Sequence, residues 1–294
     1  MHKKTHKILK TREDYVVDFV SYTLLTLLTI TILLPFCQVV TISVSPASVV
    51  NASGFHLFPT AFDFNGYREI VADEYFLHSY LITILRTSVG VTLSIFITML
   101  TAYPLSKTKL PYRRGIMLFI VFTMYFSGGM IPKYLLLKNL HLHNNFFVYI
   151  LPNLIIGFAL IITRNFFMSI PSALEESARI DGAGDFRILM QIYFPLSTPI
   201  VATIGLWYGV HHWNAWMDNM LYVTNKQLYV LQYVLHRLLE SGQTQELEAF
   251  QDVVINTETM KMAALVLSLI PIVVVYPWLQ KYFVKGMTVG SVKE

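Results

Sequence analysis

Side chains that could do chemistry gather in three places of this sequence. A polar stretch with several charged groups, residues 171–199, separates two apolar runs; Arg86 lies inside another apolar run; histidine, tryptophan and asparagine side chains gather within residues 207–216. The sequence contains no G-x-x-x-x-G-K-S/T phosphate-binding loop, no H-E-x-x-H zinc motif and no paired cysteines. We therefore expect a protein that is not an enzyme and that binds neither a metal nor a cofactor itself.

The polar stretch opens with the signal of a helix start. Ser172, followed three residues later by Glu175, forms a capping-box pattern in which the two side chains satisfy free backbone amides. We expect the helix to reach about Asp181 and to end at Gly182 or Gly184, where glycine can adopt the left-handed conformation. A second, more apolar helix should follow. A short polar helix between two apolar runs is typical of a surface that another protein binds.

Arg86 is the one basic residue well inside an apolar run. A charge at the centre of a membrane-spanning helix costs roughly 2.5–3.5 kcal/mol on insertion scales. Its side chain should therefore face a cavity, a partner chain or a carboxylate, or else extend toward the outer end of the span. If it faces a cavity on a transport pathway, it would favour anionic substrates.

The third group is aromatic and polar. His211 and His212 are adjacent, so on a helix their rings point about 100° apart, which argues against joint ligation of one metal. The neighbouring tryptophans fit an aromatic belt at the outer membrane interface. Alternatively, some of these groups line a pathway, since indole faces stack on sugar rings and polar side chains exchange hydrogen bonds with hydroxyls. His211 and Asn214 are the candidates for that role.

The elements that must position these groups are apolar helices. Of 294 residues, 54% are apolar and 14% charged, and the mean hydropathy is +0.53. Soluble domains carry about 25% charged residues, so the composition indicates a polytopic, all-α membrane protein. The expected membrane spans number six: residues 16–42, 79–103, 115–131, 146–163, 199–217 and 262–282.

Basic residues orient these spans. With the N-terminus inside, fifteen Lys and Arg residues fall in inner segments and six in outer loops, in agreement with the positive-inside rule. This distribution explains the net charge of +4 better than nucleic-acid binding does, and both termini are expected in the cytoplasm. The expected segments are a cytoplasmic segment 1–15, a membrane domain 16–283 with an inner loop 164–198 and an outer loop 218–261, and a cytoplasmic tail 284–294.

The large outer loop contains a second helical signal. Leucine and valine recur at helical spacing through residues 228–239, with polar side chains between them. Two interpretations are compatible: a helix that lies on the membrane interface, or a docking surface for an external partner.

The polar stretch also resembles the EAA loop of ABC importer permeases. The pattern is Glu-Ala-Ala, then Gly, then Ile-x-Leu-Pro, and here it reads Glu176-Ser177-Ala178-Arg179-Ile180-Asp181-Gly182-Ala183, followed by Ile192-Tyr193-Phe194-Pro195. Ser177 and Phe194 depart from it while keeping size or apolarity. In that family this helix is the coupling helix, which docks in a cleft of a cytoplasmic ATPase. The resemblance implies a coupling role for Glu175, Glu176, Ser177, Ala178, Arg179, Asp181, Gly182, Ala183, Ile192 and Pro195.

The rest of the chain is similar to the carbohydrate-uptake branch of type I ABC importer permeases, including the second subunit of alginate importers. The residues that carry this similarity are 127–132, 134–140, 164–167 and 280–290. The resemblance implies a type I importer permease fold in a bacterial cytoplasmic membrane. It also implies a second permease subunit, two ATPase subunits that use ATP and Mg²⁺, an external solute-binding protein, and an oligosaccharide substrate.

The alternative is a secondary sugar transporter driven by an ion gradient. Such a protein would carry Asp or Glu inside its spans for ion coupling, whereas the acidic residues here lie in loops or at span ends.

Overall fold

The computed structural model describes residues 11–50, 57–240 and 257–291, and every element in these ranges is a helix or a helical turn. The prediction of an all-α chain is therefore confirmed. The chain divides into two units, residues 1–72 with 247–267 and residues 73–246 with 268–294, which are described separately below.

The first unit contains the long N-terminal helix, two short helices and the beginning of the C-terminal helix. Its elements are α1 (Arg12–Ser43), α2 (Ala47–Val50), α3 (Asn65–Ala72) and the first residues of α14 (Thr257–Ser291). A capping box between Thr11 and Asp14 starts α1. Close packing ties α3 to α14, because a Cβ atom on Gly66 would lie 3.2 Å from Cγ2 of Thr259.

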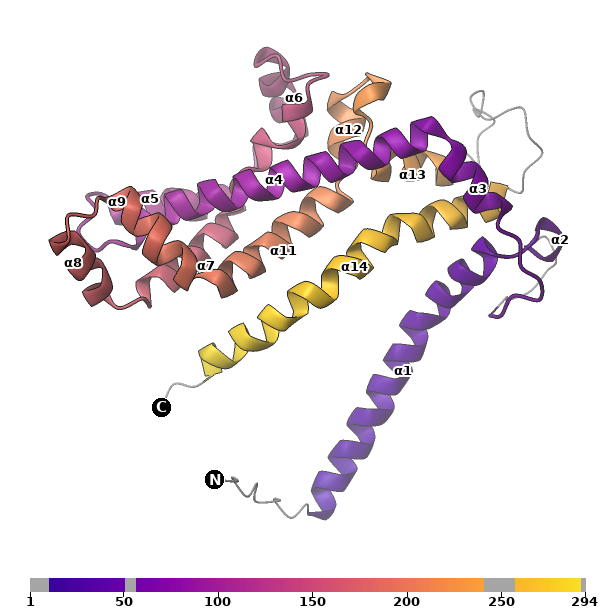
Figure 1. Ribbon diagram of the computed structural model, residues 1–294, viewed down its shortest axis with the longest axis horizontal. Coiled ribbons are helices and arrows are strands. Elements are labelled where there is room, and N and C mark those ends of the chain that lie inside the picture. Colours follow the sequence, from indigo (N-terminus) through magenta and orange to yellow (C-terminus); the bar gives the residue numbers. More distant parts are fainter. Residues whose placement is uncertain (1–10, 51–56, 241–256, 292–294) are drawn as a thin grey trace. The chain divides into compact units, whose positions relative to one another are not determined.

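The second unit is built around one long helix. Figure 1 shows α4 (Glu74–Ser106) running the length of this unit beside α11 (Thr198–Asn214) and α7 (Gly157–Met168), and it packs against both. The remaining elements are α5 (Arg113–Tyr125), α6 (Met130–Asn139), η1 (Phe146–Tyr149), η2 (Leu151–Asn153), α8 (Ser172–Ile180), α9 (Asp185–Ile188), η3 (Leu189–Tyr193), α10 (Phe194–Leu196), α12 (Met217–Tyr222), η4 (Lys226–Leu228) and α13 (Leu231–Glu240). The last part of α14 completes the unit.

The helices account for the six expected spans, but three of these are broken. Three helices in the described residues are long and apolar enough to cross a membrane unaided: Arg12–Ser43, Glu74–Ser106 and Glu258–Pro277. Three bent pairs of helices pass the same test only when the two members are taken together: α5 with α6 at 113°, η1–η2 with α7 at 52°, and the segment α9–α10 with α11 at 85°. The count of six is met when each pair is one span.

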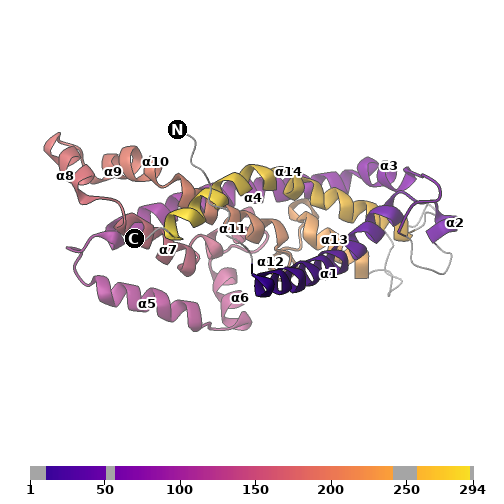
Figure 2. The same cartoon turned by 90° about the horizontal axis from the view of Figure 1, so that it is seen from below.

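Each break has a local cause. Figure 2 shows α5 and α6 meeting at a sharp bend, where Gly129 has a φ of +89° that other residues adopt only with strain. The second break follows Pro152 in η2, and the third occurs at Ser197 between two prolines, Pro195 and Pro199. The expected end of the third span at its two glycines is thus a bend rather than a terminus.

Small residues let α4 and α11 approach closely. Gly90, Ser94 and Thr98 recur at four-residue intervals on α4 and are buried. The ring of His212 packs directly on Gly90, and the Tyr208 hydroxyl lies 2.8 Å from that of Thr98. Small and hydroxyl-bearing side chains at a helix interface are the usual means of helix packing inside membranes.

The apolar face of α13 is used within the chain. Leu231 and Val234 are buried, and the backbone amide of Leu231 donates a hydrogen bond to the Thr83 hydroxyl of α4 at 2.7 Å. Val234 belongs to a core with Ile82 and Tyr149. The expectation that this face lies on the membrane or binds an external partner is corrected accordingly: among the leucines and valines of residues 228–239, Leu239 alone is exposed and Leu228 is half-buried.

Replacing Gly90 with alanine should loosen the contact between α4 and α11. The new Cβ atom would lie 2.6–2.8 Å from ring atoms of His212, an overlap of the kind that costs about 1–3 kcal/mol. The thermal unfolding midpoint in detergent should fall for Gly90→Ala and recover in Gly90→Ala/His212→Ala, compared with His212→Ala alone. Gly115→Ala on α5 meets no atom within 4 Å and is the matched control. Equal midpoints for both single glycine variants would contradict this account.

Candidate functional site

The helix α8 (Ser172–Ile180) forms where the sequence predicted it but starts differently. Pro171 occupies the cap position and has no side chain that can accept a hydrogen bond, so the helix has no side-chain cap. The predicted capping box of Ser172 and Glu175 is therefore wrong. The capping box does not form because Ser172 is already the first residue of the helix and because the Glu175 carboxylate binds other side chains.

The end of α8 agrees with the prediction. Asp181 caps the helix, and Gly182, the first of the two candidate glycines, has a φ of +80°. The Gly182 amide donates to the Arg179 carbonyl at 3.0 Å, and the Ala183 amide donates to the Ala178 carbonyl at 2.9 Å. These two bonds form a Schellman motif, which satisfies the last carbonyls of a helix and requires the left-handed conformation.

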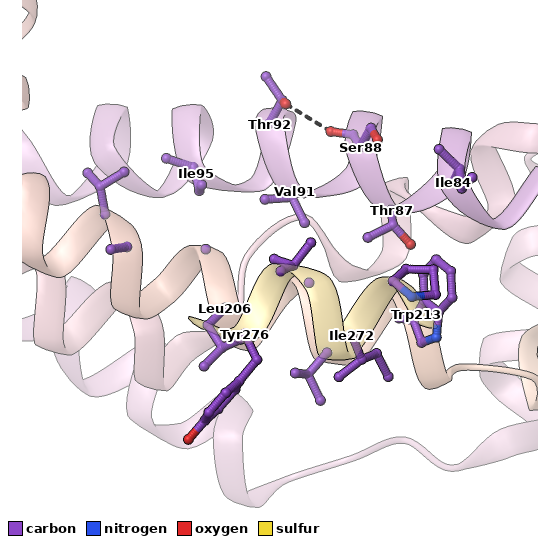
Figure 3. A pocket seen from close by; sticks show the side chains of 17 residues that line it. Ile84, Thr87, Ser88, Val91, Thr92, Ile95, Leu206, Trp213, Ile272 and Tyr276 are labelled. Atoms are coloured by element: carbon purple, nitrogen blue, oxygen red, sulfur yellow. Dashed lines mark hydrogen bonds between the residues drawn. The ribbon is translucent and has the colours of Figure 1, made fainter. Parts of the chain in front are cut away.

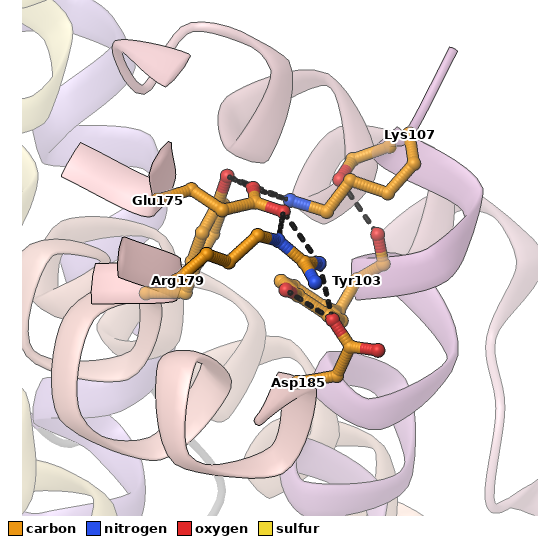
Figure 4. A network of polar contacts seen from close by, with 7 residues as sticks. Tyr103, Lys107, Glu175, Arg179 and Asp185 are labelled. Carbon is orange, nitrogen blue, oxygen red and sulfur yellow. Dashed lines mark hydrogen bonds and ion pairs between the residues drawn. The ribbon is translucent and has the colours of Figure 1, made fainter. Parts of the chain in front are cut away.

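The Glu175 carboxylate is the centre of an ion-pair network (Figure 4). It accepts hydrogen bonds from Nζ of Lys107, from the Arg179 guanidinium at 3.0 Å and from the Tyr193 hydroxyl at 2.9 Å. Arg179 pairs with Glu175 and not with the neighbouring Glu176, which is exposed. Glu175 thus joins α8 to the C-terminal end of α4, which the sequence predicts to lie on the inner side.

Two aromatic rings enclose the lysine. Nζ of Lys107 lies 4.1 Å from the centre of the Tyr103 ring and 4.2 Å from that of Tyr193, within cation–π range. Asp185 pairs with Arg179 and accepts a longer hydrogen bond of 3.4 Å from the Tyr103 hydroxyl. We call Tyr103, Lys107, Glu175, Arg179, Asp185 and Tyr193 the inner network.

Lys107 was not predicted as a site residue. In the sequence it belongs to a basic stretch that only orients the chain, and 68 residues separate it from Glu175. The sequence signal that could have indicated its role is its position, since Lys107 directly follows a long apolar helix.

The network sets the charge of Glu175. Burial by itself raises the pKa of the carboxyl group, but hydrogen bonds from Lys107, Arg179 and Tyr193, together with the charge of Lys107, outweigh it and lower the pKa. The same contacts raise the pKa of Arg179, through its bonds to Glu175 and Asp185. Glu175 and Arg179 are therefore both ionised at neutral pH.

The segment after Gly182 enters the core through an irregular helix. α9 is followed by a π-helical turn, η3, in which the Phe194 amide donates to the carbonyl of Leu189. Ile192 is half-buried in this turn and packs on the buried cluster around Met99, Phe167 and Tyr193, which we call the inner core. Pro195, which has no amide hydrogen, lies exposed just beyond it. π-turns of this kind occur frequently at functional sites.

The opposite face of α8 is open. Glu176, Ser177, Asp181 and Gly182 are exposed, whereas Ala178 and Ala183 are half-buried against the inner core. Ile180 is 86% exposed, and Phe186 on α9 is 60% exposed. A groove of about 920 Å³ runs between α8 and residues 103–111. One face of α8 is thus fixed by contacts within the chain, and the other face exposes an apolar side chain, a combination that suits a helix on which another protein docks.

Arg86 is satisfied by groups of this chain. Its side chain is fully buried and forms an ion pair with Asp218 of α12. It also donates to the Ala215 carbonyl at 3.0 Å, and its guanidinium lies 4.6 Å from the centre of the Tyr149 ring. Of the alternatives that the sequence left open, the carboxylate is the one observed. Asp218 thus satisfies the charge of Arg86, and a contact between Arg86 and an anionic substrate stays a prediction.

The aromatic group at the end of α11 divides into buried and exposed members. His212 and Trp213 are buried, whereas His211 and Asn214 are exposed. The two candidate pathway residues thus stay accessible, and their role stays a prediction. No cluster of His, Cys, Asp or Glu in the described part of the chain could hold a metal ion.

A second hollow lies between α4, α11 and α14. Figure 3 shows its lining, a groove of about 790 Å³ whose side chains are nearly all apolar. The Thr92 hydroxyl at its edge already donates to the Ser88 carbonyl at 2.8 Å. Such a surface suits lipid or another helix rather than a sugar with many hydroxyl groups.

Comparisons with known proteins cover nearly the whole chain. The family described as "Binding-protein-dependent transport system inner membrane component" matches residues 9–289. The chain is 39% identical to the polygalacturonan/rhamnogalacturonan transport system permease protein YtcP of Bacillus subtilis (strain 168), over 94% of this chain and 98% of that protein. It is 37% identical to protein LplC of the same organism, over 89% of each chain. A crystal structure of a bacterial ABC transporter involved in the import of the acidic polysaccharide alginate contains a similar chain, with a TM-score of 0.87 and 34% identity, covering 94% of this chain and all of that one.

Glu175→Gln should destabilise the protein in a pH-dependent way. The folded pKa of Glu175 lies below its unfolded value of about 4.3, so its stabilisation is present above that pH and is lost as pH falls through the folded pKa. At pH 7 we expect a loss of about 1.5–3 kcal/mol, typical of hydrogen bonds to a charged group. The difference in unfolding midpoint between wild type and variant should shrink below about pH 4. Glu176→Gln is the exposed control and should change little; a pH-independent difference for Glu175→Gln would contradict the assignment.

Proposed function

This chain belongs to the family of inner membrane components of binding-protein-dependent transport systems, and from that premise we propose that it forms half of the passage of an ATP-driven importer of acidic oligosaccharides. It is a permease subunit with several membrane spans and lies in the inner membrane. This family excludes the alternative of a secondary transporter driven by an ion gradient. The match over nearly the full length of the chain carries the proposal.

The coupling role belongs to α8. Its inner face is fixed to α4 by the inner network, while Glu176, Ser177 and the exposed Ile180 project away. Large apolar side chains exposed outside the bilayer are typical of a surface that a partner covers. We assign Ile180 and Phe186 as apolar anchors that insert into the cleft of a cytoplasmic ATPase, with Glu176 as a charged contact at its rim.

The partner subunits supply what this chain lacks. The proposed complex contains a second permease subunit, two ATPase subunits that bind ATP and Mg²⁺, and an external solute-binding protein. Both termini lie in the cytoplasm, residues 164–198 form the inner coupling loop, and residues 218–261 face the outside, where the binding protein docks. Closure of the ATPase dimer moves α8, and the spans then rock to open the passage outward. The chain itself binds no nucleotide and no nucleic acid.

The relatives support an acidic sugar as substrate. One is named for polygalacturonan and rhamnogalacturonan, and the similar solved chain belongs to an importer of alginate. Galacturonan and alginate share sugar units that carry a carboxylate. We therefore assign short uronate-containing oligosaccharides to this permease. His211 and Asn214, both exposed at the outer end of α11, are the candidates in this chain for hydrogen bonds to sugar hydroxyls.

Changes on the free face and at the end of α8 should uncouple transport. Glu176→Lys reverses a charge at the docking surface, and Gly182→Pro forbids the φ of +80° that ends the helix. Both should abolish ATP-dependent uptake in proteoliposomes while membrane insertion stays normal. Gly184→Pro is the matched control, because the φ of Gly184 is −76° and already suits proline. Uptake that survives both variants would remove α8 from the mechanism.

The substrate class can be tested with the complete complex. The chain should copurify with an ATPase and a second permease subunit, and vesicles that contain the complex and its binding protein should accumulate labelled oligogalacturonate when ATP is supplied. Neutral oligogalactosides of equal length are the matched control and should not compete. Equal uptake of the neutral series would overturn the acidic substrate and leave the importer assignment in place.

A further inference from the structure

Two ion pairs hold α4 at points far apart along the helix, one just beyond its inner end and one inside the expected span 79–103, nearer its outer end. Lys107 directly follows the inner end of α4 and binds Glu175 of α8. Arg86, nearer the outer end, binds Asp218 of α12. At 1.5 Å per residue these two cations are roughly 31 Å apart along the helix, close to the thickness of the hydrocarbon layer.

The outer attachment holds a whole subdomain, residues 215–240, rather than one side chain. Asp218 lies in the first turn of α12 and binds both terminal nitrogens of the Arg86 guanidinium. Next to it, Asn219 accepts hydrogen bonds from the Tyr149 hydroxyl at 3.0 Å and from the Val230 amide at 2.8 Å, which joins α12 to the start of α13. The Leu231 amide then binds Thr83 of α4. Any movement of this outer subdomain therefore pulls on α4.

The inner attachment is equally direct. The Lys107 ammonium is held by Glu175 and by the faces of Tyr103 and Tyr193, so α8 cannot shift without moving the inner end of α4. The other connection from α8 into the membrane passes through Ser197, where the chain bends by 85° before α11. A chain that bends sharply transmits a displacement less directly than one helix that continues from residue 74 to residue 106.

We propose that α4 is a rigid strut that couples the two sides of the transporter, with Lys107 and Asp218 as the positioning residues that fasten it. The loaded binding protein presses on the outer subdomain, Asp218 carries the displacement to Arg86, and α4 delivers it to the coupling helix through Lys107 and Glu175. Since coupling between two sites is reciprocal, ATP binding at the inner end changes the affinity for the binding protein by the same route. The proposal rests on the assignment of the chain as an importer permease.

The test uses the complete complex in proteoliposomes and compares ATP hydrolysis with and without the loaded binding protein. Asp218→Asn keeps the size of the side chain and removes its charge. We expect basal hydrolysis to be retained and the stimulation by binding protein to fall roughly five-fold or more, the lower range of typical allosteric couplings. Asp218→Glu should restore part of the stimulation.

Lys107→Gln should lower the stimulation ratio as well, and Lys107→Arg should partly restore it. The double variant Lys107→Gln/Asp218→Asn should show no less stimulation by binding protein than the more impaired of the two single variants, because both changes interrupt one route. If the losses of stimulation in the two single variants multiply in the double variant, a single strut is contradicted.

A third variant separates the strut from local folding. Leu93→Gly lies on an exposed face in the middle of α4, touches neither ion pair and makes the helix more flexible. Leu118→Gly on the exposed face of α5 is the matched control. Loss of stimulation only in the α4 variant, at equal yield of complex, supports the strut. Wild-type stimulation in both Leu93→Gly and Asp218→Asn overturns it, whereas a wild-type complex without ATP hydrolysis would instead overturn the importer assignment.

Discussion

A charge surrounded by apolar groups destabilises a protein unless an opposite charge and hydrogen bonds satisfy it. α4 carries one cation within its buried stripe and a second just beyond its inner end, and both have found carboxylates on distant parts of the chain. Removing one partner of a buried pair costs about 3–5 kcal/mol, because the other charge is left unsatisfied. The requirement to satisfy Arg86 therefore fixes where α12 can lie, and the packing of η1 and α13 follows from that position.

Local signals in the sequence were sufficient for the framework. The apolar runs predicted six spans, and glycine at position 182 predicted the end of α8, because a left-handed residue is a property of one position. The presence of a carboxylate near Arg86 could also be anticipated from the energy of a charge in the membrane. Which carboxylate it is could not, since 132 residues separate Arg86 from Asp218.

The failures share one cause. Ser172 and Glu175 have the spacing of a capping box, yet the lysine at the end of α4 offers Glu175 a full charge, which is a stronger partner than a backbone amide. The leucines of α13 have the spacing of an amphipathic helix, but spacing does not say whether membrane, partner or the chain itself covers them. In both cases a contact between residues far apart in sequence decided the outcome, and local patterns carry no information about such contacts.

The π-turn before Pro195 sets the rotation of the helical path on its two sides. It inserts one extra residue into a helical path, and a single residue corresponds to a rotation of about 100° around a helix axis. Asp185, before the turn, bonds to Tyr103 of α4, and Tyr193, the last residue of the turn, bonds to Lys107 just after α4. Deleting one residue between 189 and 193 would rotate these two side chains by about 100° relative to each other, so the length of this short stretch constrains which of them can contact the end of α4.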